Sequence, residues 1–348
     1  MKVKLSDITK YSKGVQINGD DLIDDGEYIY LNGGINPSGR WSSSNVSGDT
    51  VTISEGGNSS GYVNYITEPF WCGAHCYYLY EGPSNSKYLY YALKSQQNRL
   101  FAIRSGACMP NIKKSDLGNF ELEFDYNERK QDEVVAVLSG VELVIARRQK
   151  ELELIDELIK ARFVDMFGDN MENKRNFPIE SLEVHANIVS GITKGRKTKE
   201  LNLTEVPYMA VSNVKDGYID WTTVKTILAT SSEIEQYRLQ TNDVLMTEGG
   251  DPDKLGRGAL LTKVPENCIH QNHIFRVRLD SRVNPIYFEE YLQTARPKRY
   301  FLKAAKQTTG IASINMTQLR HMPLILPPME EQKEFADFVH RVDKSKVV

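Results

Sequence analysis

Two clusters of Lys and Arg are the residues of this sequence best suited to chemistry, and that chemistry is contact with a polyanion. The stretch 191–199, GITKGRKTK, carries four cations within six residues of a glycine-containing segment. A second cluster lies between 298 and 306 and runs into the polar segment 307–310. Cations on loops neutralise phosphates, and Ser, Thr, Asn and Gln beside them contact phosphates and base edges. The two clusters therefore predict loops that bind DNA.

The predicted DNA contacts are spread over both halves of the chain, and each is a cation or a polar residue on an expected loop. They are Lys13, Arg40, Ser43, Asn45, Arg104, Lys113, Lys194, Arg196, Lys197, Lys199, Lys254, Arg257, Lys303, Lys306 and Thr308. For any single loop, a solvated surface without a ligand explains the same residues about as well, because charged residues mostly lie on surfaces.

A metal site is the second chemistry to consider. Cys72, His75, Cys76 and Cys108 offer four zinc ligands, but their spacing is not the paired C-x2-C of a ribbon or knuckle. Half-buried cysteines and a satisfied histidine explain them more simply. We therefore expect no metal in this chain.

Catalysis is the third possibility, and the sequence speaks against it. The glycine-rich stretch 249–258 lacks the P-loop pattern and carries acidic residues that would repel phosphate. The stretch 326–329, LPPM, has the prolines of an adenine methyltransferase loop without its polar and aromatic residues. Acidic residues at 330–331 open a helix, where Glu is expected as a cap. The chain is predicted not to be an enzyme by itself.

The elements that carry these residues occur twice. The second half repeats several segments of the first in the same order, which is typical of a duplicated module. The matching pairs are 5–14 with 182–191, 28–41 with 208–221, 49–57 with 243–250, His75 with His273, and 106–117 with 310–319. Within each copy, turns rich in Gly and Asn separate short runs of Tyr, Val and Ile, which predicts strands; short helices are expected at Ser86–Leu100 and Pro285–Lys306.

Between the copies lies a different kind of segment. From Glu128 to Phe167, apolar residues recur at alternating steps of four and three, a heptad seam interrupted by Arg148 and Arg162. Forty helical residues make a rod of roughly 60 Å. A second helix is expected after Pro327-Pro328, but with Val348 as the last residue it reaches only about 30 Å. The predicted packing residues are Leu138, Val141, Ile145, Leu152, Ile155, Ile159, Phe335, Phe338 and Val342.

The predicted fold class is α+β, with two repeated globular domains separated by long antiparallel coiled-coil helices. The expected boundaries are a first domain at 1–127, a long helix at 128–169, a second domain at 170–327 and a short, seemingly truncated helix at 328–348. Part of the long seam then needs cover from another helix or from a second copy of the chain.

Charge, hydropathy and cysteine content limit the possible location and partners of the chain. The 348 residues carry a net charge of −3, divided as −6 over 1–170 and +3 over 171–348. No apolar run reaches the ~20 residues of a membrane helix, so no membrane contact is expected. Four scattered cysteines are too few for a disulfide framework, which favours a reducing cytoplasm.

The combination resembles a known family. Ile314-Asn315-Met316, the stretch 322–328 and Glu330-Glu331-Gln332 resemble the entry into the spacer helix of the DNA-specificity subunit of type I restriction–modification enzymes. The stretches 110–117, 120–122 and 128–131 look like a degraded copy of that entry, and 54–57 and 247–250 resemble the family's glycine turns. The resemblance spans nearly the whole chain, although no single motif is diagnostic.

That resemblance implies two target-recognition domains, each reading one half of a bipartite site on double-stranded DNA, with spacer helices fixing the gap. It implies docking of two DNA adenine methyltransferase subunits, which would carry S-adenosylmethionine, and of a motor-nuclease subunit, which would use ATP and magnesium. No cofactor is expected in this chain itself.

Two alternatives remain open at this point. A specificity subunit of a related system, in which one partner holds both methyltransferase and nuclease, would have nearly the same sequence features. A scaffold whose coiled coil joins proteins and whose modules bind no DNA belongs to another class.

Overall fold

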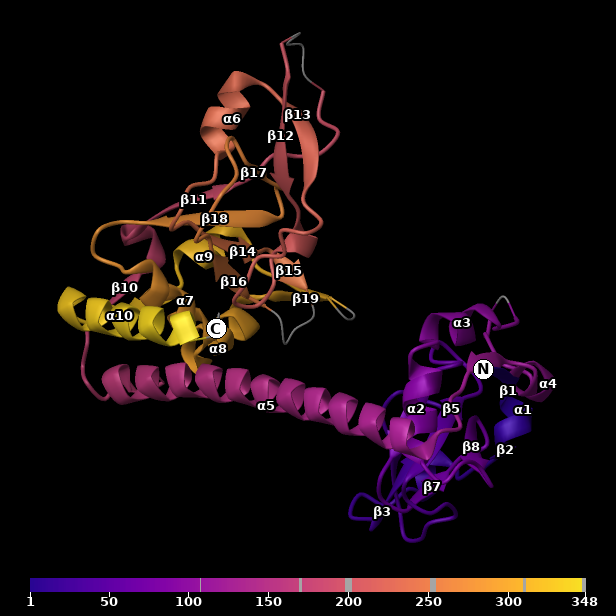
Figure 1. Ribbon diagram of the computed structural model, residues 1–348. Helices are drawn as coiled ribbons and strands as arrows, with labels where there is room; N and C mark the ends of the chain where they lie inside the picture. Colours follow the sequence, from indigo (N-terminus) through magenta and orange to yellow (C-terminus); the bar gives the residue numbers. More distant parts are fainter. Residues whose placement is uncertain (107, 169–170, 198–201, 251–254, 309–310, 346–348) are drawn as a thin grey trace. The chain divides into compact units, whose positions relative to one another are not determined.

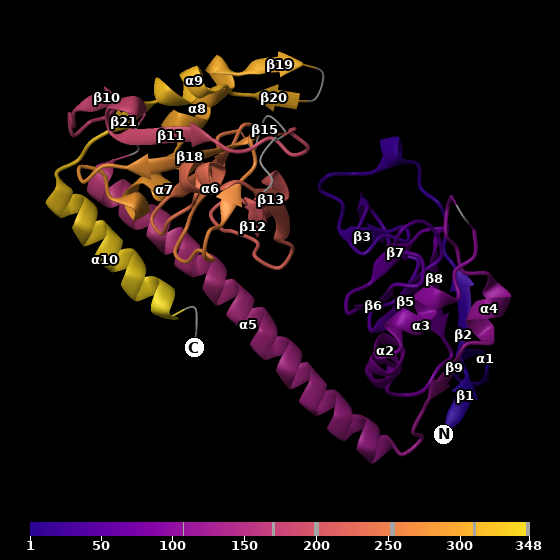
Figure 2. The same cartoon turned by 90° about the horizontal axis from the view of Figure 1, so that it is seen from above.

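The computed structural model describes residues 1–348 except 107, 169–170, 198–201, 251–254, 309–310 and 346–348, and it leaves the side chains of 306–308, 311 and 345 undescribed. The chain forms two compact units, Met1–Arg148 (unit 1) and Gln149–Val348 (unit 2). The boundary falls inside one continuous helix, α5 (Glu128–Phe167), so each unit contains part of it (Figures 1 and 2). None of the described helices combines the length and apolar character needed to cross a membrane.

Unit 1 is built on two small sheets. Its strands are β1 (Lys2–Lys4), β2 (Lys10–Lys13), β3 (Tyr28–Leu31), β4 (Gly39–Trp41), β5 (Thr50–Ser54), β6 (Val63–Ile66), β7 (Phe70–Cys72), β8 (Cys76–Tyr80) and β9 (Glu121–Glu123). Its other helices are α1 (Leu5–Ile8), η1 (Gly19–Asp21), α2 (Ser86–Lys94), α3 (Gln97–Ala102) and α4 (Lys114–Gly118). The larger sheet has the order β2-β8-β5-β6 and the smaller one β4-β3-β7, while β1 pairs with β9.

Unit 2 has the same plan with insertions. Its strands are β10 (Ile179–Ser181), β11 (Ala186–Ser190), β12 (Thr204–Met209), β13 (Lys225–Ala229), β14 (Val244–Thr247), β15 (Gly249–Gly250), β16 (Gly258–Leu260), β17 (Ile269–His270), β18 (Ile274–Leu279), β19 (Lys306–Thr308), β20 (Ile311–Ser313) and β21 (Pro323–Ile325). Its helices are η2 (Leu182–Val184), η3 (Val211–Asn213), α6 (Ser231–Tyr237), α7 (Pro285–Gln293), α8 (Ala295–Ala304), α9 (Met316–Arg320) and α10 (Met329–Ser345).

The predicted duplication is confirmed strand by strand. The sheet β11-β18-β14-β16 of unit 2 repeats β2-β8-β5-β6 of unit 1, and β13-β12-β17 repeats β4-β3-β7. In both small sheets the middle strand is antiparallel to one neighbour and parallel to the other. The pairing β10-β21 repeats β1-β9, so the first and last strands of each unit meet. The α+β class with two repeated domains is therefore correct.

Local sequence explains where the elements form. The run TVTIS of β5 is rich in β-branched residues and is buried along its whole length. Asn85 caps α2 by accepting a hydrogen bond from the Tyr88 N–H, and Asn284 caps α7 in the same way, with Pro285 in the first turn. The two expected short helices are each divided in the structure, into α2 and α3 and into α7 and α8; residue 306, expected in a helix, lies in β19.

The N-terminal part of α5 is held to unit 1 mainly by polar side chains. The Tyr91 hydroxyl donates to the Glu142 carboxylate at 2.7 Å, and Asn85 Nδ2 donates to the Asp132 carboxylate at 2.8 Å. Gln131 is buried and donates from Nε2 to the Asp125 carbonyl at 2.6 Å. These contacts fix the start of the helix on its own domain.

The C-terminal part of α5 is held in unit 2 by aromatic packing. Phe163 and Phe167 of α5 both contact Phe335 of α10, with ring centroids 5.3 and 5.6 Å apart, and Phe163 stacks on Tyr287 of α7. Figure 2 shows α10 lying beside this end of α5. The Phe167 ring contacts Phe335, and the Arg162 guanidinium lies over the Phe338 ring, so a step toward the start of α5 is a step toward the end of α10 and the two helices are antiparallel.

The predicted seam divides into a covered and an exposed stretch. Ile159 and Phe335 are buried, while Leu152, Ile155, Phe338 and Val342 are half-buried. Leu138, Val141 and Ile145 are instead 38%, 50% and 52% exposed. The reason is geometric: a helix the length of α10 spans about 25 Å, less than half of α5.

Candidate nucleic-acid interface

The same short turn follows one of the two inner strands of the larger sheet in both units. In unit 1, β5 ends at Ser54 and leads into Glu55-Gly56-Gly57; in unit 2, β14 ends at Thr247 and leads into Glu248-Gly249-Gly250. The Glu55 N–H donates to the His75 carbonyl at 2.8 Å, and the Glu248 N–H donates to the His273 carbonyl at 3.0 Å. Each glutamate is therefore fixed beside the histidine that precedes the neighbouring strand.

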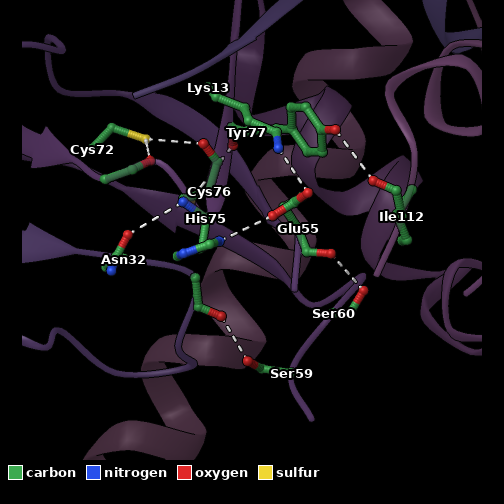
Figure 3. Close-up of polar contacts among 12 residues, drawn as sticks. Lys13, Asn32, Glu55, Ser59, Ser60, Cys72, His75, Cys76, Tyr77 and Ile112 are labelled. Atoms are coloured by element: carbon green, nitrogen blue, oxygen red, sulfur yellow. Dashed lines mark hydrogen bonds and ion pairs between the residues drawn. The ribbon is translucent and has the colours of Figure 1, made fainter. Parts of the chain in front are cut away.

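In unit 1 the side chains of this turn form a three-residue cluster, drawn in Figure 3. Lys13 Nζ, at the end of β2, lies 2.7 Å from Glu55 Oε1, and His75 Nδ1 lies 3.2 Å from Glu55 Oε2. Burial raises the pKa of Glu55, but the hydrogen bonds from Lys13 and His75 outweigh burial and leave that pKa below its ordinary value. The glutamate is thus a carboxylate shared between two donors.

In unit 2 the glutamate and histidine recur without the lysine. His273 Nδ1 lies 2.6 Å from Glu248 Oε2, and Ser190 occupies the strand position that corresponds to Lys13. Val211, Glu248, Gly249, His273 and Ser313 line a shallow hollow at this place.

A close approach of two backbones is also repeated beneath these turns. A Cβ atom added to Gly14 would lie 1.8 Å from the Cys72 carbonyl oxygen, and one added to Gly191 would lie 1.9 Å from the His270 carbonyl oxygen. Both positions therefore require glycine.

The structure brings some of the predicted DNA contacts together around the turns. Arg104 Nη1 donates to the Asn58 carbonyl of the unit 1 turn at 3.4 Å, and its guanidinium lies over the Phe101 ring. Lys113 is exposed and follows Ile112, whose N–H donates to the Glu55 carbonyl at 2.9 Å. With Lys13, these residues form a cation-bearing surface that we call the unit 1 turn surface (Lys13, Glu55, His75, Arg104 and Lys113).

Around the turn of unit 2, Arg257 is half-buried, and its carbonyl accepts a hydrogen bond from the Thr247 N–H. The strand β19, which contains Lys306 and Thr308, pairs with β20, and β20 pairs with Gly249-Gly250. The side chains predicted at Lys306 and Thr308 lie outside the described part of the structure, as do Lys254 and Lys199 altogether.

Other predicted contacts are engaged within the protein. Arg196 forms a two-pronged ion pair with Glu233 of α6, with Nε 2.6 Å from Oε1, and its Nη2 also donates to the Leu228 carbonyl at 3.0 Å. The hydrogen bonds from Arg196 hold the pKa of Glu233 at about 2, despite an opposing effect of burial. The ion pair between Arg196 and Glu233 thus connects the 191–197 loop to α6.

Arg40 and Asn45 also have structural partners. Arg40 donates to the Gly26 and Glu27 carbonyls, and Asn45 makes paired hydrogen bonds with the backbone of Cys72. Ser43, Lys194, Lys197 and Lys303 are exposed. DNA contact by these residues stays a prediction.

The cysteines do not surround a common point. Cys72 and Cys76 are buried in unit 1, Cys108 is exposed, and His75 points to Glu55. Among the described residues, no group of three or more His, Cys, Asp or Glu side chains has the arrangement of a metal site.

Sequence reasoning did not select Glu55, His75, Glu248 or His273 as site residues. The signal that could have found them was already visible, because each recurs at corresponding places in both halves. Their pairing required the fold, since 19 residues separate Glu55 from His75 and 24 separate Glu248 from His273.

Comparison with known proteins adds independent findings. A family profile described as "Type I restriction modification DNA specificity domain" matches residues 1–155 and 186–347. The specificity subunit of the type I restriction enzyme EcoKI from Escherichia coli is 25% identical over 322 residues, which is 87% of this chain and 68% of that protein. A candidate type I specificity subunit from Mycoplasma genitalium is 36% identical over 130 residues, 36% of this chain.

The fold has a match among solved structures. The crystal structure of a type I restriction–modification S subunit from M. genitalium superposes with a TM-score of 0.63 at 20% identity, covering 99% of this chain and 90% of that one. The alignments span about a third of the first Mycoplasma relative, 34%, and 41% of a second one from Mycoplasma pneumoniae.

Proposed function

The chain belongs to the type I restriction–modification DNA specificity family, and on that premise we propose that it directs a type I complex to a bipartite DNA target. Each unit reads one half of the target, and α5 sets the gap between the halves. The chain itself is a non-catalytic recognition subunit. Its proposed location is the cytoplasm, where such a target is accessible.

The observation that best supports this proposal is the duplication on one continuous helix. Two units of equal topology carry the same Glu–His turn, and both contain part of α5. Two equal readers suit a target with two separate parts, because joining two weak binding events raises the overall affinity and makes it depend on their spacing. A straight helix of 40 residues is roughly 60 Å long, enough for more than one ~34 Å turn of DNA.

The proposed partners supply the chemistry. Two adenine methyltransferase subunits carry S-adenosylmethionine and expose the target adenine, and a motor-nuclease subunit uses ATP and magnesium. Partner subunits would also contribute cations to DNA binding, which accommodates a recognition chain whose own net charge is −3.

The exposed stretch of α5 is proposed to take a further helix. Leu138, Val141 and Ile145 are each more than a third exposed, and apolar residues in this pattern pack against another helix. A second copy of this chain is one proposed source of that helix.

A binding experiment tests the proposal. We expect the isolated full chain to bind duplex DNA weakly, and its complex with the cognate methyltransferase to bind its methylation target far more tightly at the same salt concentration. Fluorescence anisotropy with labelled duplexes measures both. Equal affinity of the chain alone and in the complex would contradict the proposal that partner subunits contribute to DNA binding.

Charge reversal distinguishes a DNA reader from a scaffold. Lys194 and Lys197 are exposed on the same loop, so the K194E/K197E variant should lose most of its target methylation when assembled with the methyltransferase. The matched control K263E/K333E reverses two exposed lysines elsewhere in unit 2 and should retain it. Full methylation by both variants would favour a scaffold that binds no DNA.

The related system with a fused partner makes the same predictions for this chain. It differs in the partner, because one polypeptide would then hold both methyltransferase and nuclease activity. Co-purification of a single partner with both activities would identify it.

A further inference from the structure

The Glu–His pairs, Glu55–His75 and Glu248–His273, are a feature that the fold itself does not explain. Both imidazoles are exposed, His75 at 60% and His273 at 57%. Exposed ion pairs contribute only about 0–1 kcal/mol to stability, so stability gives little reason to keep the same pair in both units.

The Glu–His pair is the same in both units, although the side chains around it differ. Lys13 of unit 1 corresponds to Ser190 of unit 2, and Tyr77 corresponds to Phe275. The backbone hydrogen bonds stay equal, because the Ile112 N–H donates to the Glu55 carbonyl at 2.9 Å and the Ile314 N–H to the Glu248 carbonyl at 2.8 Å. A shared scaffold thus presents the same two side chains in a changed environment.

The hydrogen bond to the carboxylate orients each ring. Nδ1 faces the glutamate in both pairs, at 3.2 and 2.6 Å, so Nε2 is the ring nitrogen on the side away from the carboxylate. Nε2 of His273 also lies 3.4 Å from Asn272 Nδ2, and because an amide nitrogen only donates, a phosphate that accepts a hydrogen bond from this Nε2 would have to replace that contact. When the ring is protonated, Nε2 carries an N–H that donates to an anionic acceptor.

The charges around the unit 1 pair indicate which ligand fits. Lys13 neutralises Glu55 at 2.7 Å, and Arg104 and Lys113 come from the segments that contact the same turn. A cationic surface with an outward imidazole suits a phosphate, because phosphate oxygens accept charge-assisted hydrogen bonds. A protein partner at the same place would have to match this cationic surface.

We propose that His75 and His273 each contact a phosphate of the DNA backbone, one in each half of the target. The pairs thereby fix where each unit sits on the duplex, and other residues read the bases. This inference rests on the proposed function, since it names the DNA atoms that the two turns bind.

The test measures DNA affinity against salt for the complex of the full chain with its methyltransferase. The variants are H75Q, H273Q and the double variant, assayed on the target duplex and on a shuffled duplex at pH 6.0. Glutamine keeps a hydrogen-bond donor and removes the charge. H321Q is the matched control, because His321 is also exposed, at 58%, and lies near Glu183.

The expected result is a loss of affinity of similar factor on both duplexes, with an unchanged methylation motif. The slope of log K against log salt should become shallower by up to ~0.9 for each histidine replaced, and H321Q should behave as wild type.

Three results would overturn the inference. The first is an unchanged slope of log K against log salt in the double variant. The second is a loss of affinity confined to the target duplex, which would mean base contact. The third is a loss of methyltransferase binding while the salt slope stays unchanged, which would mean a protein interface. A wild-type complex that binds no DNA would overturn the proposed function as well, so the two failures are distinguishable.

Discussion

Replacing Glu233 by Gln should destabilise unit 2 by about 2 kcal/mol at pH 7, because Glu233 joins the 191–197 loop to the start of α6. Its carboxylate accepts two hydrogen bonds from Arg196 of the 191–197 loop, and it accepts one from the Thr230 N–H at the start of α6. The N–H of Glu233 donates in turn to the Thr230 hydroxyl at 3.2 Å, which completes a capping box.

The magnitude follows from the pKa of Glu233. That pKa is held at about 2, against an ordinary value of 4.5, and each pH unit corresponds to about 1.4 kcal/mol. The full difference of about 3 kcal/mol is reduced by solvent screening, since both side chains are 21% exposed. We expect about 2 kcal/mol for E233Q, a similar loss for R196M, and a coupling between the two of about 1.5 kcal/mol.

The assay is urea unfolding followed by tryptophan fluorescence. The chain has three tryptophans, and substitution of Trp41 and Trp71 by Phe leaves Trp221 to report on unit 2. K194M is the matched control, because Lys194 is an exposed cation on the same loop; its effect should stay within about 0.5 kcal/mol.

A coupling below about 0.5 kcal/mol would refute the structural role of Arg196. The same variant also separates positioning from DNA contact. If Arg196 serves the fold, R196M should leave the salt dependence of DNA binding unchanged, whereas loss of a phosphate contact would lower the slope by about 1.

Three further predictions concern stability. The contribution of Glu233 is fully present above about pH 4.5 and is lost as the pH falls toward 2, so wild type and E233Q should converge in unfolding free energy over this range; a constant difference would contradict the assignment. F335A should lose about 3–5 kcal/mol in urea unfolding, because it empties the aromatic cluster that joins α10 to α5, and a loss below 1 kcal/mol would disprove that packing. G14A should prevent unit 1 from folding normally, as measured by circular dichroism, because the added Cβ would overlap the Cys72 carbonyl. The control G140A, on the open face of α5, should instead stabilise the protein by about 0.5–1 kcal/mol. Equal stability of the two variants would be inconsistent with the close approach at Gly14.

Local and periodic signals were enough to predict the architecture. The heptad spacing between Glu128 and Phe167 predicted the long helix, and α5 spans these residues. The repeated segments predicted two copies of one unit, and the strand orders agree. Such patterns are readable because each depends on neighbours within a few residues or on direct repetition.

The candidate site was harder to predict, because it depends on contacts between distant residues. Arg196 lies in the most basic loop of the sequence, yet its partner Glu233 is 37 residues away. Asn45 looked like a base-reading residue and instead hydrogen-bonds to Cys72 of β7. No local pattern distinguishes a cation that pairs inside the protein from one that faces a ligand.

The exposed stretch of α5 shows a further gap between sequence and structure. Heptad spacing identifies Leu138, Val141 and Ile145 as packing positions, but it does not say which helix packs on them. In the described part of the chain, α10 is too short to reach them. Heptad spacing therefore predicts that this stretch packs against a helix without identifying that helix.

The central claim is that two similar units read two separated parts of one DNA target while other subunits perform the chemistry. The most direct measurement is to express the chain with its methyltransferase in a host without adenine methylation and to map every methylated adenine in the genome. A motif of two short specific parts separated by a gap of constant length is the predicted result. A single contiguous motif, or methylation that does not depend on this chain, would contradict the claim.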